Sequence, residues 1–353
     1  MHAGSTAGVR VSGVPDGVQR FTAPLTGHAI FLVVTVSDQA VDGIRDVLRD
    51  LGGLVQTVRF RDPGDGLSCT VGIGSRMWPT LVGGPSPREL HPFTPVVGAV
   101  HTAVATPGDL LFHIRGDRAD LCFEFERLLV AALGDGIQVE DETSCFRSFD
   151  RRDLLGFVDG TANPVGTDAA DSVLVGDEDP AFAGGTYIVV QKYLHPLDRW
   201  QALPTEAQER IMGRTKADNV ELDDATSGQK SHKTLATIVD DAGVEHDIIR
   251  DNMPFGRPGH AEFGTYFLGQ SRALWVIETM LRRMFVGDPP GVHDRLLDFS
   301  VPKTGSTFFA PSAGLLSTLG DAVDAPAAAS PIVEASPTSL GIGANRAPVS
   351  QEV

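Results

Sequence analysis

The residues best suited to chemistry lie near the middle of the chain, where Asp159 stands between Gly156 and Gly160 and is followed by Asn163-Pro164. Glycine lets the backbone pass close to a bulky partner, and Asn-Pro blocks a helix directly afterwards. We therefore expect Asp159 to present its carboxylate from a bent, non-helical segment. Asp-Gly is also a common turn dipeptide, so this short motif taken alone favours a simple turn.

Two later segments contain side chains that could complete a site. One holds Ser231-His232, and the other begins with Arg250-Asp251-Asn252. Because side chains alternate along an extended segment, Arg250 and Asn252 leave the same face and could line one wall of a pocket. The chain has 10 histidines, so spacing alone does not select His232. Taken by itself, Arg250 fits a surface or ion-paired arginine better than a site residue.

The first half of the chain contains alternating strand and helix patterns that would position these residues. The expected strands are His28–Val36, Val55–Phe60, Ser68–Ile73, Leu110–Ile114 and Gly136–Phe149, and the expected helices are Gln39–Asp50 and Asp117–Leu133. Turn residues at 62–66 predict a hairpin between the second and third strands. This order predicts an α+β fold with an antiparallel sheet and helices on one face, close to the ferredoxin-like pattern.

The second half repeats a similar order without a sequence repeat. Its expected strands are Thr186–Tyr193, Val244–Arg250, Gly264–Gly269 and Leu296–Ser300, and its expected helices are Thr205–Met212 and Arg272–Phe285. We therefore predict two ferredoxin-like domains, at 21–150 and 151–311. A loose N-terminus over 1–20 and a disordered tail over 312–353 would flank them, because the tail is rich in Ala and Pro and has little to bury.

The composition of the chain excludes several classes of protein. A formal net charge of −17 opposes binding to nucleic acid or to anionic membranes. No apolar stretch approaches the ~20 residues that span a bilayer, and no secretory signal is apparent at the N-terminus, which favours a cytoplasmic location. The three cysteines, Cys69, Cys122 and Cys145, lack metal-site spacing and are expected to be buried hydrophobic residues.

Taken together, Gly156–Thr161, Ser231-His232 and Arg250–Pro254 resemble, in order and spacing, the dye-decolourising peroxidases, and in particular their bacterial B-type group. The resemblance covers residues 21–311. It implies a fold of the dimeric α+β barrel-like kind with haem b held mainly by the second domain. By this resemblance His232 is the axial ligand of the haem iron, Asp159 is the distal acid, and Arg250 and Asn252 complete the distal pocket.

The implied reaction reduces hydrogen peroxide to water through a ferryl intermediate and oxidises phenols or dyes one electron at a time. Asp159 would move a proton between the two peroxide oxygens. Arg250 would keep the pKa of Asp159 low and stabilise the negative charge that develops on the departing oxygen. Asn252 would orient peroxide or water.

The axial imidazole gains electron-donating power when its other ring nitrogen bonds a carboxylate. Asp294 is the candidate partner of His232, although a surface ion pair with Arg295 explains this aspartate equally well. Two rival functions stay open: a haem-carrying or haem-processing protein with little turnover, and a non-haem binding module in which Asp159 is only a turn residue.

The tail contains a second resemblance. Ser339–Gly343 is similar to the C-terminal peptide that loads cargo proteins into encapsulin nanocompartments. Leu340 and Ile342, separated by glycine, could insert into shallow apolar pockets of a shell protein as an extended peptide. This resemblance implies an encapsulin partner and a homo-oligomeric cargo, whereas the composition alone fits a solubilising tail.

Overall fold

The computed structural model of the chain describes residues 17–225 and 228–321. The loading-peptide resemblance at Ser339–Gly343 therefore lies outside the described residues. Within the described ranges, no helix combines the length and the apolar character needed to cross a membrane.

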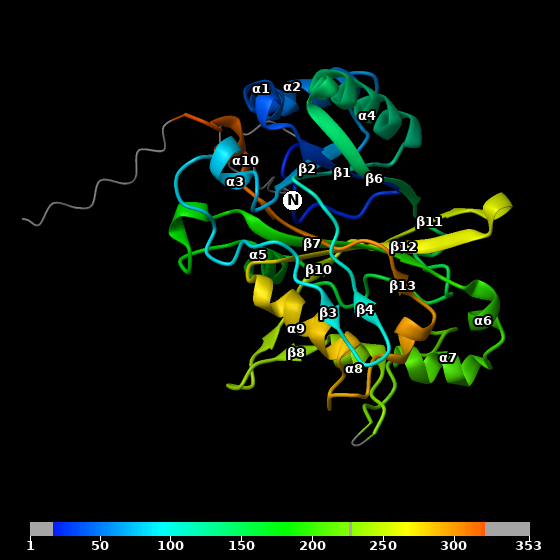
Figure 1. Cartoon of the computed structure of the whole chain (residues 1–353). Coiled ribbons are helices and arrows are strands. Elements are labelled where there is room, and N and C mark those ends of the chain that lie inside the picture. The colour runs from blue at the N-terminus through cyan, green and yellow to red at the C-terminus, as the bar shows by residue number, and fades with distance from the viewer. Residues whose placement is uncertain (1–16, 226–227, 322–353) are drawn as a thin grey trace, which may run out of the picture. The chain divides into compact units, whose positions relative to one another are not determined.

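The first half forms an antiparallel sheet covered on one face by helices. Its main strands are β1 (His28–Val36), β2 (Ser68–Ile73), β5 (Leu110–Gly116) and β6 (Ile137–Phe146), and its long helices are α1 (Val41–Arg49), α2 (Leu51–Arg59) and α4 (Ala119–Leu133). The strands pair in the order β2-β5-β1-β6. Helices α1, α2 and α4 lie together on one side of this sheet (Figure 1). This is the ferredoxin-like arrangement that the sequence predicts.

The strand expected at Val55–Phe60 is wrong, because helix α2 extends through Arg59 and Phe60 is the residue at its C-terminal cap. Leu51, Val55 and Val58 are buried and lie three or four positions apart, which is the period of one helix face. The hairpin expected across residues 62–66 therefore does not form. Its removal leaves the order β-α-β-β-α-β, which matches the ferredoxin-like pattern more closely than the predicted order did.

The second half repeats this topology. Its main strands are β7 (Thr186–Leu194), β10 (Ile249–Arg250), β12 (Glu262–Ser271) and β14 (Ser306–Ala310), with β11 (Met253–Arg257) pairing with β12, and its main helices are α7 (Thr205–Met212), α8 (His232–Ala236) and α9 (Leu274–Phe285). The strand order of the second half, β10-β12-β7-β14, corresponds strand by strand to the order β2-β5-β1-β6 of the first half. The similarity of the halves, expected from element order alone, is confirmed.

The last strand of the second half is not where the sequence analysis placed it. Residues expected as strand Leu296–Ser300 form the short 3-10 helix η5 (Arg295–Asp298), which begins where the Asp294 side chain accepts a hydrogen bond from the Leu296 N–H. Strand β14 takes the expected place in the sheet, and all of its residues are buried. Such a short, fully buried run has no alternation by which to recognise it.

Shorter elements connect these units. They are α3 (Trp78–Leu81), β3 (Val96–Val97), β4 (Thr102–Ala103), α5 (Thr167–Val173), α6 (Leu197–Gln201), β8 (Ile238–Val239), β9 (Glu245–His246), β13 (Val301–Pro302) and α10 (Ala313–Ser317). Helix α10 packs Leu316 into the core, so packed chain continues past the boundary expected at residue 311. Cys69, Cys122 and Cys145 are buried free thiols, as predicted.

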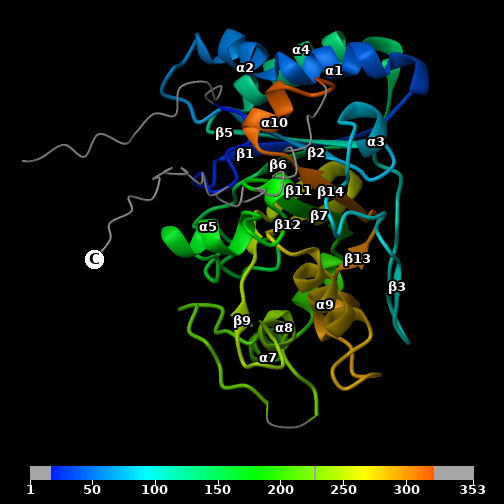
Figure 2. The ribbon, with the colours of Figure 1, turned by 90° about the vertical axis from the view of Figure 1, so that its left-hand side faces the viewer.

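The two halves share one ten-stranded sheet, because β14 pairs with β7 on one side and with β2 on the other. The sheet curls so that its two inner faces meet: the rings of Phe31 on β1 and Tyr266 on β12 stack with centroids 4.1 Å apart. Helices α1, α2 and α4 lie on the opposite side of the sheet from α8 and α9 in both views (Figures 1 and 2).

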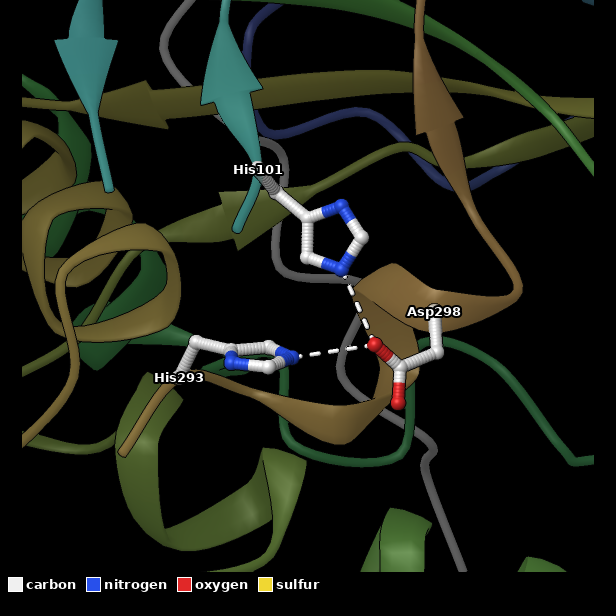
Figure 3. A group of neighbouring side chains, drawn as sticks. All are labelled: His101, His293 and Asp298. Carbon is white, nitrogen blue, oxygen red and sulfur yellow. Dashed lines mark hydrogen bonds and ion pairs between the residues drawn. The ribbon is translucent and has the colours of Figure 1, made fainter. Parts of the chain in front are cut away.

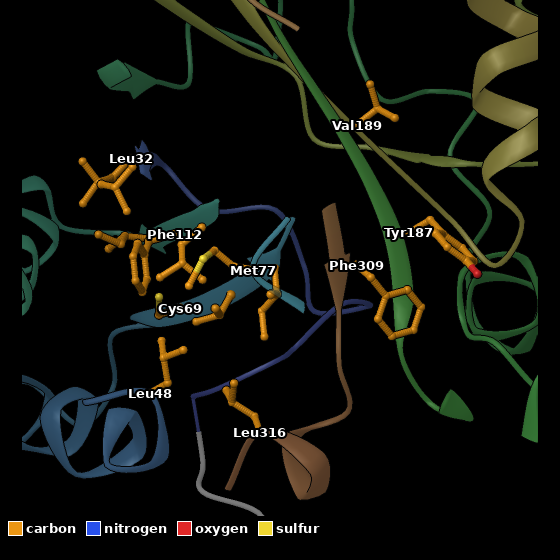
Figure 4. Packing of buried hydrophobic residues seen from close by; sticks show 14 of the residues in the cluster. Leu32, Leu48, Cys69, Met77, Phe112, Tyr187, Val189, Phe309 and Leu316 are labelled. Atoms are coloured by element: carbon orange, nitrogen blue, oxygen red, sulfur yellow. The ribbon is translucent and has the colours of Figure 1, made fainter. Parts of the chain in front are cut away.

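The helices of both halves pack on the outer faces of this curled sheet. Figure 4 shows part of that packing, with Leu48 of α1 beside Cys69 and Phe112 of the first half, and Phe309 of β14 beside Tyr187 of β7. A second buried cluster fills the space between the inner faces. The space between the strands β7 and β12 and the helices α8 and α9 is therefore the place where a ligand could bind.

Candidate active site

A large cavity opens in the second half, between the sheet and helices α8 and α9. Its volume is about 1240 Å³, counting the solvent at its mouth. Its wall is formed by several elements of the second half. They are the glycine-rich loop around Gly156–Gly160, helices α8 and α9, strand β12, the segment between β10 and β11, and the residues of η5. Much of the wall is apolar, and Leu155, Phe157, Phe267, Met280 and Met284 are among the lining residues. An apolar cavity of this size with a few polar groups is typical of a cofactor or substrate site.

His232 enters the cavity wall at the start of α8. Ser231 caps this helix, its hydroxyl accepting from the Thr234 N–H. Nδ1 of His232 lies 2.7 Å from Oδ2 of Asp294, whose side chain is completely buried. Oδ1 of Asp294 accepts a hydrogen bond from the Leu296 N–H at 2.9 Å, so both carboxylate oxygens are held. Nε2 of His232 has no partner among the described residues.

The contact between Asp294 and His232 is the one that the sequence analysis proposed. The alternative considered there, a surface ion pair with Arg295, does not form, because Arg295 pairs with Asp298. His195 also lines the cavity, but both of its ring nitrogens are engaged. Its Nδ1 lies 3.1 Å from the Phe299 carbonyl oxygen, and its Nε2 lies 2.8 Å from Thr265 Oγ1. Of these two histidines, His232 is the one that can offer a nitrogen to a ligand.

Asp159 lies on the bent loop that its neighbours predict, since Gly156 and Gly160 both have positive φ, of 94° and 77°. Its Oδ1 accepts a hydrogen bond from the Gly160 N–H at 2.7 Å and one from Asn252 Nδ2 at 3.4 Å. The carboxyl lines the cavity. The loop therefore points a carboxylate at the same space that His232 reaches from α8.

Burial raises the pKa of Asp159, while the Gly160 hydrogen bond and the charges of Arg147 and Arg250 act in the opposite direction. The expectation that Arg250 keeps this pKa low is therefore correct in the direction of its effect but wrong in the net result. Desolvation outweighs the nearby cations. Arg250 and Asp159 do not form a direct ion pair; Nη2 of Arg250 donates to the Ala236 carbonyl oxygen at 3.2 Å instead.

Arg250 and Asn252 both line the cavity, as their spacing predicts. Asp251, between them, is buried and points the other way, toward Arg115 and Arg147 at 3.3 and 3.4 Å. The Oδ1 atom of Asn252 is buried and has no hydrogen-bond partner among the described residues. An unpaired buried acceptor beside a cavity is the kind of group that a bound ligand or water satisfies.

Asn163 is a site residue that the sequence analysis missed. Its Oδ1 accepts from the Arg250 N–H at 3.0 Å, and its Nδ2 donates to the Arg250 carbonyl oxygen at 2.7 Å. The side chain therefore fixes the backbone of Arg250 to the loop that holds Asp159. The sequence showed Asn163 only as part of a helix-blocking Asn-Pro pair, and nothing in it linked this residue to Arg250.

The residues in the wall fit a haem. Neutral imidazole is a common axial ligand of haem iron, and a carboxylate bonded to its second nitrogen strengthens it. His232 has such a carboxylate in Asp294 and a second nitrogen left without a partner. The apolar side chains of the wall suit the faces of a porphyrin, and Asp159, Arg250 and Asn252 supply polar groups in the same cavity.

Comparison with known proteins identifies the family of this chain. The model of the Dyp-type peroxidase N-terminal region matches residues 19–147, and that of the C-terminal region matches residues 150–314. The chain belongs to the family of Dyp-type, or dye-decolourising, peroxidases. It is accordingly a peroxidase, which confirms the enzyme class and the family that the sequence analysis predicted.

Relatives of known sequence and structure extend the match over most of the chain. A dye-decolorizing peroxidase of Mycobacterium tuberculosis is 49% identical over 92% of this chain and 96% of its own length. DyPB from Rhodococcus jostii RHA1 superimposes with a TM-score of 0.84 at 54% identity, covering 86% of this chain and 98% of that one. Variants of it have been solved in complex with heme.

An encapsulated relative is also known. The encapsulated DyP-type peroxidase from Mycobacterium smegmatis has a TM-score of 0.83 at 51% identity, covering 85% of this chain and 97% of that one. The predicted fold, an α+β arrangement of two ferredoxin-like halves, is confirmed by these neighbours and by the sheet itself.

Proposed function

We propose that this chain is a haem b peroxidase in which Nε2 of His232 is the axial ligand of the iron. The observation that supports this most directly is the hydrogen bond of 2.7 Å between His232 Nδ1 and the buried Asp294, which leaves Nε2 available in the cavity wall. A charged acceptor at Nδ1 makes the imidazole a stronger donor through its other nitrogen. The heme complexes of the Rhodococcus jostii relative agree with this choice of cofactor.

Haem, when bound, supplies a coordination position for peroxide and the electrons that cleave its O–O bond. The protein then has to move a proton from one peroxide oxygen to the other. Asp159 is the group we assign to this transfer, as base and then as acid. Its raised pKa brings its affinity for protons closer to the working pH, where transfer in both directions is efficient.

Two further side chains would support that transfer. The Arg250 guanidinium places a permanent cation near Asp159, and such a charge stabilises negative charge developing on the departing oxygen in a site of low dielectric constant. Asn252 donates to Asp159 from Nδ2 and keeps Oδ1 free to accept from peroxide or water. We assign both residues positions in the distal wall of the proposed haem site.

We also propose the reducing substrates, the partner and the location. Phenols or dyes would supply single electrons. Since a close relative is an encapsulated protein, Ser339–Gly343 is proposed to bind an encapsulin shell, with a homo-oligomeric cargo inside a cytoplasmic nanocompartment. The boundary between two ferredoxin-like domains is proposed near residue 150.

His232→Ala tests the proposed cofactor site. The variant should lose most of its haem or show an altered axial ligand, since a methyl group cannot coordinate iron. Haem content per chain and the visible spectrum are the measurements. His246→Ala is the control, because His246 pairs with Asp240 outside the cavity wall. Full haem content with an unaltered spectrum in His232→Ala would remove this residue from the site, and tightly bound haem without peroxide turnover in the wild type would favour a carrier.

A further inference from the structure

Three side chains converge at a point that the peroxidase site does not use. His101 lies in the turn between β3 and β4, His293 lies in the loop after α9, and Asp298 ends η5. Nε2 of His101 lies 2.9 Å from Asp298 Oδ1, and Nε2 of His293 lies 3.0 Å from the same oxygen. Figure 3 shows both rings pointing their Nε2 atoms at this carboxylate. One ligand atom from each residue lies within 4.8 Å of the others.

This spacing is close to what a small metal ion requires. Zn²⁺ lies about 2.0–2.2 Å from imidazole nitrogens and carboxylate oxygens, so tetrahedral ligands are about 3.4 Å apart. The contacts of 2.9 and 3.0 Å would have to lengthen to that value, and all three ligand atoms already lie within 4.8 Å of one another, so adjustments of the side chains suffice without a change of the fold. Two histidines and one carboxylate are also the ligand set of known zinc and non-haem iron sites.

The hydrogen bonding of the three side chains is compatible with metal binding. Nδ1 of His101 and Nδ1 of His293 have no hydrogen-bond partner among the described residues, so a proton carried on Nδ1 would leave the lone pair of Nε2 for an ion. Burial would raise the pKa of Asp298, but hydrogen bonds from both histidines and from Arg295 lower it to about 2. The carboxylate is therefore ionised, and Arg295 Nε holds Oδ2 at 2.5 Å while Oδ1 faces the rings.

Solvent reaches the three side chains. Their exposed fractions are 21% for His101, 16% for His293 and 20% for Asp298. An ion could therefore reach these side chains without unfolding of the protein, and water could fill its remaining coordination positions. Other histidines with acidic partners, such as His91 with Glu278 and His246 with Asp240, have a single carboxylate and no second histidine. Among the described residues, His101, His293 and Asp298 are the group with three convergent ligands.

We propose that His101, His293 and Asp298 form a binding site for a divalent transition-metal ion of the Zn²⁺ or Fe²⁺ type, separate from the haem cavity. Two chain segments would be joined by the ion: the β3–β4 turn of the first half and the loop that precedes η5. That loop also contains Asp294, the partner of His232. The ion would therefore link the loop that contains Asp294 to the β3–β4 turn of the first half.

Equilibrium dialysis of the full-length haem-loaded protein against Zn²⁺ tests the site. The protein is first stripped of loose metal with a chelator, and bound zinc per chain is then measured. The wild type should bind at least one equivalent more than His101→Gln, and Zn²⁺ should raise its melting temperature by a few degrees, since an ion that binds only the folded state stabilises it. Glutamine keeps an N–H donor for Asp298, so the variant should retain a hydrogen bond between residue 101 and Asp298 but should not bind the metal.

Two further variants complete the experiment. Asp298→Asn removes the anionic ligand and should lose the same equivalent, so the test stands even if one variant folds poorly. His91→Ala removes a histidine paired with only one carboxylate and should bind zinc as the wild type does. Equal zinc binding by the wild type, His101→Gln and Asp298→Asn would overturn the proposal, as would the absence of saturable zinc binding by the wild type.

Discussion

At the scale of single residues, the proposed distal wall contains side chains that hold one another in place. Asn163 makes two hydrogen bonds to the backbone of Arg250, of 3.0 and 2.7 Å. Asn252 bonds Asp159 from the same segment. The groups that we propose for proton transfer lie on two different segments and are thereby held close together, as efficient proton transfer would require.

Asn163→Ala should therefore slow the reaction with peroxide while haem stays bound. Without the amide, the Arg250 backbone loses both contacts to the loop, and a displacement of about 1 Å can cost about a hundredfold in rate. Stopped-flow kinetics with peroxide measures this rate, and haem content is the control. A wild-type rate in Asn163→Ala would show that Arg250 is positioned without this residue.

Glu126 on α4 provides a residue-scale test of stability. Burial, with a smaller contribution from Glu142, raises the pKa of Glu126 to about 7. Because its pKa is higher in the folded than in the unfolded protein, the folded state binds this proton more tightly, and stability is lost as pH rises from about 4.5 through 7.

Glu126→Gln removes this ionisation. The variant should melt a few degrees above the wild type at pH 8 and show little or no advantage at pH 5. Thermal unfolding at the two pH values gives the comparison. An equal effect of the substitution at both would mean that Glu126 is ionised in the folded protein throughout this range.

At the scale of elements, the segment from β10 to β11 contacts two different parts of the molecule. Arg250 and Asn252 face the cavity, whereas the buried Asp251 faces Arg115 on β5 and Arg147 after β6. The alternation of side chains along an extended backbone makes this possible. The first half of the chain thus anchors a segment of the site in the second half.

Arg115→Leu should destabilise the protein, because it removes one of the cations that face the buried Asp251. Breaking a buried ion pair costs about 3–5 kcal/mol, and Arg147 should reduce this to about 2–3 kcal/mol. Urea unfolding measures the change. Arg118→Leu is the control, since its pairs with Asp62 and Asp120 are exposed and exposed ion pairs contribute little to stability. Equal losses in both variants would contradict the anchoring role of Arg115.

The sequence predicted the elements whose pattern is local. Long runs such as β1, α4 and β7 were found because each has enough residues to show its period. Helix α2 was mistaken for a strand because it is short and contains two adjacent glycines, and β14 was missed because its neighbours bury all of it. The glycine-rich loop and the alternation of Arg250 with Asn252 were also local features. The contacts of Asn163 with Arg250 and of Asp251 with Arg115 join residues far apart in sequence, so spacing could not reveal them.

At the scale of the whole molecule, we predict that loading into an encapsulin shell depends on the proposed loading peptide and on the number of chains in the oligomer. Leu340→Asp combined with Ile342→Asp should abolish co-purification with a co-expressed encapsulin shell, because charges would enter apolar pockets. Haem content and peroxide turnover should stay as in the wild type. Several tails on one oligomer would bind together, so loading should also weaken if the oligomer is dissociated. Undiminished loading of the double variant would return the tail to a solubilising role.

The pairing of Asp251 with arginines of the first half limits which first and second halves can be combined in one chain. Recombination between relatives at the middle of the chain would place this aspartate opposite whatever residues the other parent supplies, and a buried charge without its counterpart is costly. Strand β14 adds a second constraint, because it pairs with β7 of its own half and with β2 of the other. The halves resemble each other in topology, yet a half taken from a different relative should fit only if it also supplies the partners of Asp251 and of β14.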